Sequence, residues 1–217
     1  MTFLEAINAV LRRLREDAVT SSNSTDYSKL IGDFVNQAVY ECEHAWDWNE
    51  LKTTITINTV SGTDNYAFSN SETKIIQVVN DTKKWLLRPV RDDVFYKNAF
   101  IGRTTGSPQY YVFLNAIGSA SNTVFLQPEP DGVETIYFLV VKHTEAYAID
   151  GSDDASVITI PTMPIVLNAY AKAISERGED GGIGFNEADQ AARFALADSI
   201  SLDSALNHQS KVNWHAV

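Results

Sequence analysis

The sequence predicts an α+β fold: a four-helix body formed by N- and C-terminal helix pairs, with a mostly antiparallel β subdomain inserted between them. Near both ends of the chain, apolar residues recur three and four positions apart, as on amphipathic helices. In the middle they alternate with polar residues and are rich in β-branched types, as in strands. The expected segments are 1–49 (two helices), 50–160 (the β subdomain), 161–209 (two helices) and 210–217 (a flexible tail).

The N-terminal segment predicts two helices. Thr2 followed by Glu5 is a capping box, and apolar spacing continues the first helix to about Asp17. The second helix should run from Asp26 to about Trp46, roughly 30 Å at about 1.5 Å per residue. A helix this long needs partners along its whole apolar face. Only the other three helices offer them, which is why we predict a single four-helix body.

Two tryptophans mark the end of the second helix, where the period changes from helix to strand. Trp46 still falls on the helical stripe and should pack into the body. Trp48 lies past the stripe and should pack under the first strands. We therefore expect the two indoles to hold the helical body and the β subdomain together, because large aromatics dominate packed interfaces. Stacking on a ligand is the alternative.

The middle of the chain predicts a series of strands separated by turns. Gly106, Pro108, Pro128 and Pro130 punctuate it. The stretch 91–100 predicts a short helix. The expected strands lie within 51–60, 66–68, 73–81, 83–90, 106–116, 122–131, 134–147 and 157–161.

The C-terminal segment returns to helical spacing. One helix should begin near Pro164 and stop at Gly178, and Asn186 should cap a second that reaches His208. The tail beyond it carries Trp214, which is hard to explain on a polar, flexible end of a lone monomer. Because tryptophan is a favoured interface anchor, docking of this tail onto a partner is one reading, and folding back on its own body is the other.

The charge balance restricts the partners. There are 28 acidic residues against 17 Lys and Arg, a net charge of −11, and gripping nucleic acid needs basic side chains. Cys42 is the single cysteine, so no internal disulfide can form. The sequence offers no unbroken apolar run of membrane-spanning length and no signal-peptide pattern at its start.

Several patterns suggest chemistry only weakly. Glu41 and His44 form an E-x-x-H pair, but the C-terminal helices carry no second copy to complete a di-metal site. The acidic loop at 150–154 lacks the alternating ligands of a calcium loop. The glycine-rich stretch 178–185 follows a helix, whereas a phosphate cradle follows a strand. Cys42 lies on the core stripe, as an inert thiol would. We therefore predict no metal, cofactor or catalytic residue.

Arg12, Arg13 and Arg15 cluster near the end of the first helix of an acidic chain. One reading is a solvated helix end, where cations suit the helix dipole. The other is a salt-bridging edge that meets the acidic surface of another subunit.

Four stretches in order resemble the head-to-tail adaptor proteins of tailed bacteriophages, also called head-completion, tail-accessory or tail tubular A-like proteins. They are AWDWNELKTTITI (45–57), GSPQYY (106–111), LQPEPD (126–131) and IPTMP (160–164). The resemblance runs through most of the chain and rests on the order and spacing of these stretches.

The resemblance implies a structural protein of the virion, assembled in the host cytoplasm. Its copies, commonly a dodecamer, would form a ring at the head–tail junction. The helical part would dock beneath the portal, the β part would face the tail nozzle or tail tube, and double-stranded DNA would pass through without specific binding. The tail that docks on the portal would comprise Lys211, Val212, Asn213, Trp214 and His215.

Two other functions stay open from the residues alone. A virion-associated cell-wall hydrolase would use two carboxylates across a cleft. A carbohydrate- or protein-binding module on the β subdomain would gather exposed aromatics, with Tyr110 or Tyr111 as candidates.

Overall fold

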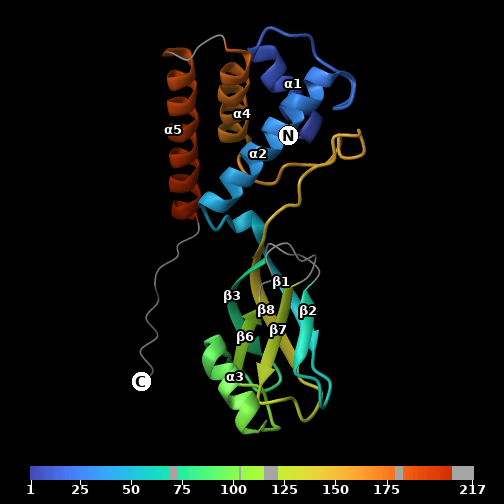
Figure 1. The fold of residues 1–217 in the computed structure, drawn as a ribbon. Coiled ribbons are helices and arrows are strands. Elements are labelled where there is room, and N and C mark those ends of the chain that lie inside the picture. The colour runs from blue at the N-terminus through green and yellow to red at the C-terminus, as the bar shows by residue number, and fades with distance from the viewer. Residues whose placement is uncertain (69–72, 103, 115–121, 179–182, 207–217) are drawn as a thin grey trace. The chain divides into compact units, whose positions relative to one another are not determined.

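The computed structural model describes residues 1–68, 73–102, 104–114, 122–178 and 183–206. The predicted α+β class is confirmed: these residues form five α-helices and two four-stranded sheets (Figure 1). The contacts divide the chain into a helical unit, Met1–Leu51 with His143–Val217, and a β unit, Lys52–Lys142. The β unit is thus an excursion of the chain between two parts of the helical unit.

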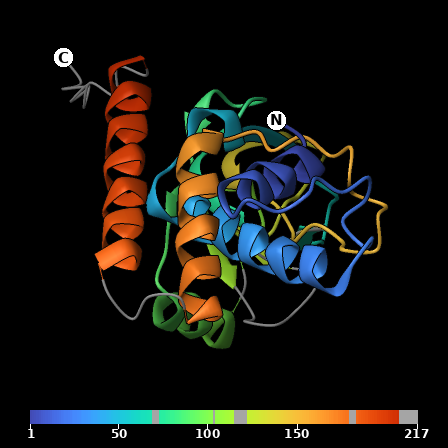
Figure 2. The ribbon, with the colours of Figure 1, turned by 90° about the horizontal axis from the view of Figure 1, so that it is seen from above.

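The helical unit is built around α4 (Thr162–Arg177). This helix contacts α1 (Phe3–Arg13), α2 (Asp26–Ala45) and α5 (Ile183–Leu206), and α1 also contacts α2. Viewed from above, α5 lies on one side of α4, and α1 and α2 lie on the other (Figure 2). The buried stripe of α2 includes Ile31, Val35, Ala38, Val39 and Cys42, as the helical spacing predicted.

The helix ends follow the predicted caps at some positions and depart from them at others. The Thr2 hydroxyl accepts from the amide of Glu5, whose carboxylate accepts from the amide of Thr2, so the predicted capping box is present. However, α1 ends at Arg13 and does not reach Asp17, because the chain turns there with left-handed backbone at Arg15.

The start of α5 differs from the prediction. It begins at Ile183, so Asn186 lies inside its first turn and is not the N-cap. The reason is that residues before Asn186 already face α4: Phe185 lines a hollow together with Ala171 of α4. The α4 helix ends as expected, with Gly178 in the left-handed region that suits glycine.

The β unit contains two sheets that share one core. Their strand orders are β1-β8-β3-β4 and β2-β7-β6-β5, and all pairs are antiparallel except the short parallel pair β5–β6. The core includes Val78, Tyr111, Leu126 and Phe138, which come from both sheets. The elements are β1 (Lys52–Asn58), β2 (Asn65–Phe68), β3 (Thr73–Asn80), β4 (Trp85–Leu86), β5 (Arg88–Pro89), α3 (Asp92–Ile101), β6 (Tyr110–Leu114), β7 (Asn122–Gln127) and β8 (Thr135–Lys142).

The segment after β8 corrects the prediction of a strand at 157–161. Val157 forms only an isolated bridge with Thr2. The amide of Phe3 donates to the carbonyl of Ser156, and the Phe3 ring stacks on Tyr147 at 5.0 Å between ring centroids. The backbone of this segment is therefore used by the start of α1, and the contacts assign the segment from residue 143 onward to the helical unit.

Candidate interaction surfaces of the helical unit

One face of α4 is only partly covered by its neighbours. Met163, Leu167, Tyr170 and Ile174 recur three or four residues apart, so they form one stripe along the helix. Met163 is 57% exposed and the other three are half-buried. Two adjoining hollows lie over this stripe: one of about 400 Å³ between α1 and the start of α4, and one of about 680 Å³ between α1, α4 and α5. We call this surface, floored by the four residues, the α4 groove.

The three clustered arginines form one wall of the α4 groove. Arg12 and Arg13 line the hollow over Met163, and Arg13 and Arg15 line the larger one. All three are exposed, and none has a carboxylate within 4.0 Å among the residues that the structure describes. The one hydrogen bond of their side chains among the described residues is donated by Arg13 to the Met163 sulfur, at 3.7 Å. Their charge is therefore available to a partner.

Arg15 occupies an unusual backbone position. Its φ of 60° lies in the left-handed region, directly after the helix C-cap Leu14. The amide of Arg15 donates to the carbonyl of Arg12, and the amide of Glu16 donates to the carbonyl of Leu11. These are the two hydrogen bonds of a Schellman motif, which usually places glycine at this position. The arginine side chain is thus kept at a backbone cost.

The outer face of α5 is the second uncovered surface. Phe194 is 70% exposed, Leu202 63% and Leu206 74%, although all three are large apolar residues. The buried residues Ala188 and Ala192 lie on the side of the helix opposite Phe194, whereas Leu202 and Leu206 are exposed near its C-terminal end. A helix that exposes large apolar residues is expected to have a partner.

The tryptophans predicted at the junction are both held by hydrogen bonds within the helical unit. The Trp46 indole donates to the Asp203 carboxylate of α5 at 2.8 Å. The Trp48 indole is almost fully buried and donates to the carbonyl of Cys42 at 2.8 Å. These bonds tie the end of α2 to the end of α5 and cap the last turn of α2. The role of the two indoles in holding the two units together stays a prediction.

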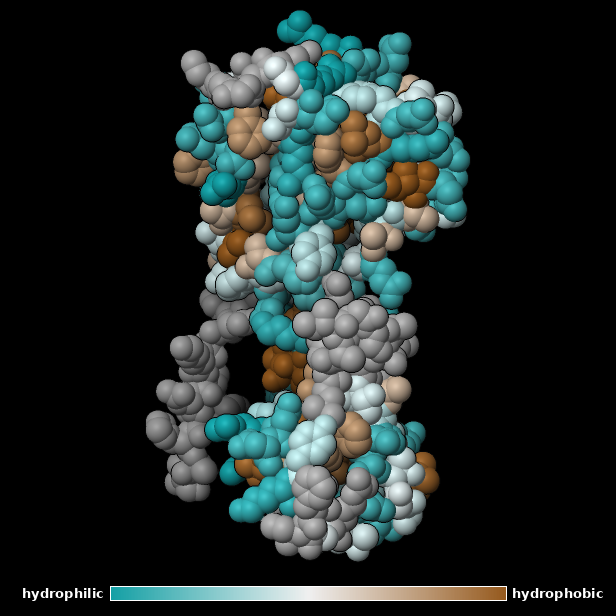
Figure 3. Space-filling model, viewed as in Figure 1, coloured by the Kyte–Doolittle hydropathy of each residue, from teal (hydrophilic) through white to brown (hydrophobic). Residues whose placement is uncertain are grey.

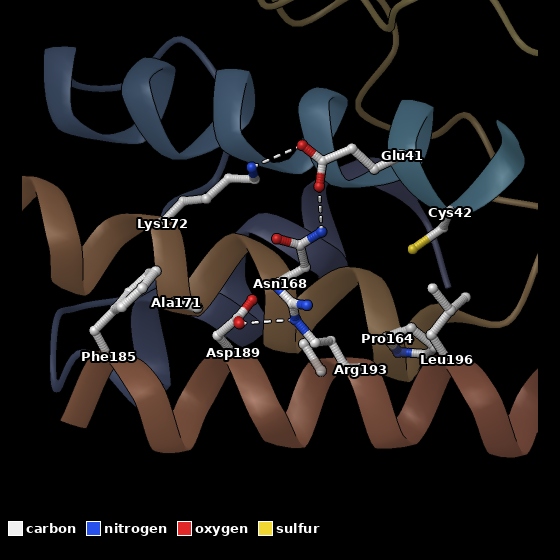
Figure 4. A pocket seen from close by; sticks show the side chains of 11 residues that line it. Glu41, Cys42, Pro164, Asn168, Ala171, Lys172, Phe185, Asp189, Arg193 and Leu196 are labelled. Carbon is white, nitrogen blue, oxygen red and sulfur yellow. Dashed lines mark hydrogen bonds and ion pairs between the residues drawn. The ribbon is translucent and has the colours of Figure 1, made fainter. Parts of the chain in front are cut away.

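A hollow between α2, α4 and α5 contains the most varied set of polar side chains (Figure 4). Glu41 accepts from Asn168 at 2.7 Å and from Lys172 at 2.9 Å, and Asp189 accepts from Arg193 at 2.8 Å. Burial acts to raise the pKa of Glu41, but these hydrogen bonds hold it below its ordinary value. The Glu41 carboxylate is therefore ionised at neutral pH, and both carboxylates contact basic side chains, an arrangement typical of structural ion pairs.

Cys42, which lines the same hollow, is not a poised nucleophile. Burial, together with the nearby carboxylates of Glu41 and Glu43, raises the pKa of the thiol to about 12. The reactive form of cysteine is the thiolate, so this thiol is inert at neutral pH. The sequence interpretation of Cys42 as a core residue agrees with its 2% exposure.

The weak metal-site patterns have structural partners instead. His44 stacks on His143 at 4.2 Å between ring centroids, and the buried Glu43 accepts from the amide and hydroxyl of Thr144. In the acidic loop, Asp154 accepts from the amide of Ser22. No group of three or more metal-ligating side chains occurs within the described part of the chain.

Two further expectations concern side chains that could bind a ligand or partner. Tyr111 is buried in the β core, whereas Tyr110 is 39% exposed, because neighbours on a strand point to opposite faces. The prediction that Tyr111 could be an exposed binding aromatic is therefore wrong. The predicted docking tail at 211–215 lies outside the described residues.

The surface side chains of the helical unit indicate the class of protein. On the face seen in Figure 3, hydrophobic side chains reach the surface of the helical unit in separate patches among hydrophilic ones. The groups left without internal partners are arginines and large apolar residues at helix surfaces, which suit contact with other proteins. No helix among the described residues is long and apolar enough to cross a membrane. The fold is α+β, and its uncovered helix surfaces are of a kind that suits contact with other proteins.

The comparison with protein families identifies the family of this chain. Residues 1–213 match the family model of the SU10 adaptor protein. The chain therefore belongs to the SU10 adaptor family, a family of phage head-to-tail adaptors, as the sequence resemblance had indicated. No curated protein matches the sequence. Membership implies a structural role at the head–tail junction of a phage particle, in contact with portal and tail components.

Proposed function

We propose that copies of this chain form a closed ring, a dodecamer, which joins the portal vertex of a phage capsid to the tail. In this proposal α1, α2, α4 and α5 act as a single four-helix body that docks beneath the portal. The β unit contacts the tail nozzle or tail tube. The observation that carries the proposal is the pair of uncovered surfaces on the helical unit, in a chain of the adaptor family.

The charge of the chain supports a passive channel for DNA. Each copy has a net charge of −11, so a ring concentrates negative charge around its axis. Phosphate contacts need lysine and arginine, and a channel without them repels the DNA backbone and lets it slide. The protein would line the exit channel without binding the DNA that passes.

The C-terminal residues Lys211, Val212, Asn213, Trp214 and His215 are proposed to dock on the portal. Trp214 supplies an aromatic anchor for a pocket on the partner. A segment that becomes ordered only on docking would make the portal the template for assembly. Trp46 and Trp48 are proposed to keep the β unit attached to the helical body as these contacts form.

The test is the mass of the purified 24.0 kDa protein by light scattering, dilute and concentrated, with electron microscopy of any large species. It is followed by binding to the portal of the phage that carries the gene, with and without residues 210–217. Closed rings, or portal binding that is lost on truncation, support the proposal. A single-copy mass at every concentration, together with no portal binding, refutes it.

A further inference from the structure

We infer that the contact between neighbouring copies joins the α4 groove of one copy to the outer face of α5 in the next. This inference rests on the proposed ring and specifies its interface. The occupant of the groove is a second copy of this chain, presenting the ridge formed by Phe194 and Asp198 on α5.

The ridge on α5 combines an aromatic side chain with a carboxylate. At 3.6 residues per turn, positions four apart lie close to one line, so Phe194 and Asp198 project from the same side. Asp198 has no hydrogen-bond or ion-pair partner among the described residues. Phe194 is 70% exposed.

The α4 groove has the complementary chemistry. Its floor is apolar, through Met163, Leu167 and Tyr170 among others, and offers a place for the Phe194 ring. Its α1 wall carries Arg12, Arg13 and Arg15, whose charges have no carboxylate partner within the described part of their own chain.

Joining the two surfaces pairs opposite charges. Docking would bring Asp198 of one copy to the arginines of the next, and would bury Phe194 against the apolar floor. Complementary charges across an interface fix its register and suppress wrong partners. An aromatic anchor in a central pocket surrounded by polar groups is the usual composition of an interaction hot spot.

The placement of the surfaces determines the kind of assembly. The ridge is part of α5, whereas the arginines lie in and directly after α1, and these two helices are on opposite sides of α4 (Figure 2). A contact between two different surfaces is heterologous, and repeating it produces a ring when the rotation closes. A two-fold contact of ridge with ridge would instead stop at a dimer and place like charges together.

Cysteine cross-linking distinguishes these geometries. Met163→Cys and Phe194→Cys are made as single variants and treated with a short bismaleimide after assembly, alone or on the portal. Cys42 stays in place, because it is buried and its thiol is protonated. We expect a cross-linked dimer only when the two variants are mixed, and a ladder of higher species when one chain carries both changes.

Several cross-linking results overturn the pairing. Self-linking of Phe194→Cys alone shows a two-fold contact. Assembled rings in which Met163 and Phe194 never cross-link place the interface elsewhere, and the ring proposal survives. Linking of Met163→Cys to a cysteine of the portal assigns the groove to that partner. Material that never assembles, alone or with the portal, refutes the ring and the interface together.

Charge reversal provides an independent measurement. Arg12→Glu with Arg15→Glu should weaken assembly about ten-fold or more, since close interfacial charge pairs are worth at least about 1.5 kcal/mol. Asp198→Arg on the other chain should restore assembly in a mixture. Lys29→Glu is the matched control, because Lys29 is an exposed cation of the same unit that is already paired with Asp26. Equal loss in the control, or no rescue in the mixture, counts against the pairing.

Discussion

Replacing Arg15 by glycine should make the protein more stable. An L-residue in the left-handed region costs about 1–2 kcal/mol, and Arg15 has a φ of 60°. Glycine adopts this conformation without a Cβ penalty but loses about 0.5–1 kcal/mol more backbone entropy on folding. We therefore expect Arg15→Gly to raise the free energy of unfolding by about 0.5–1 kcal/mol, since the Arg15 side chain makes no hydrogen bond or ion pair among the described residues.

The matched control is glycine three residues earlier. Arg12 is also exposed but lies within α1, where the backbone is right-handed. Glycine inside a helix is about 1 kcal/mol less favourable than a good helix former, so Arg12→Gly should lower stability. The two variants remove the same side chain and should differ by about 1.5–2 kcal/mol, with opposite signs.

Thermal unfolding followed by far-UV circular dichroism measures the difference. For a chain of 217 residues, 1 kcal/mol shifts the midpoint by about 2–4 °C. If Arg15→Gly lowers the midpoint as much as Arg12→Gly does, the assignment of a strained arginine is wrong. A variant that folds more stably but assembles less well would show that the Arg15 side chain is retained for contact with another molecule.

Three other predictions concern the inner part of the helical unit. Cys42 should not react with thiol reagents at pH 8 until the protein unfolds, because its pKa is raised to about 12 in the folded state. Its contribution to stability is complete below about pH 8.5 and is lost as the pH rises toward 12. Cys42→Ala should therefore reduce the loss of folding stability at alkaline pH. Glu43→Ala should cost about 1–3 kcal/mol in urea unfolding, since it leaves the amide of Thr144 without its acceptor, and Glu43→Gln should cost less. Trp46→Phe removes the hydrogen bond to Asp203, so hydrogen exchange should rise in the last turns of α5 and stay unchanged in α1.

Local signals in the sequence were sufficient to predict most helices and strands. The Thr2 capping box, the stripe of α2 and the short helix near residue 91 depend on neighbours a few positions away, and each is present. The change of period after Trp48 likewise marks the start of β1. The same logic found the arginine cluster, because three cations in four residues of an acidic chain are visible without a structure.

Other features depend on contacts between distant segments. The sequence could not tell Tyr110 from Tyr111, because both are aromatic and only the packing of one sheet on the other buries Tyr111. The stretch 157–161 resembled a strand of the β subdomain, but the backbone at Ser156 and Ile158 pairs with the first residues of the chain. The apolar spacing of α4 is nearly continuous around the helix, so the pattern did not indicate which face its neighbours leave open.

The sequence by itself therefore determined the fold class, the capping box of the first helix, the charge balance and the family. These follow from residue type and short-range periodicity, which act along the chain. The tertiary structure decided that Met163 to Ile174 floor a groove, that three arginines stand along it, and that Phe194 is exposed on α5. Those facts depend on which helix faces meet, and packing selects the faces only when the segments come together in space.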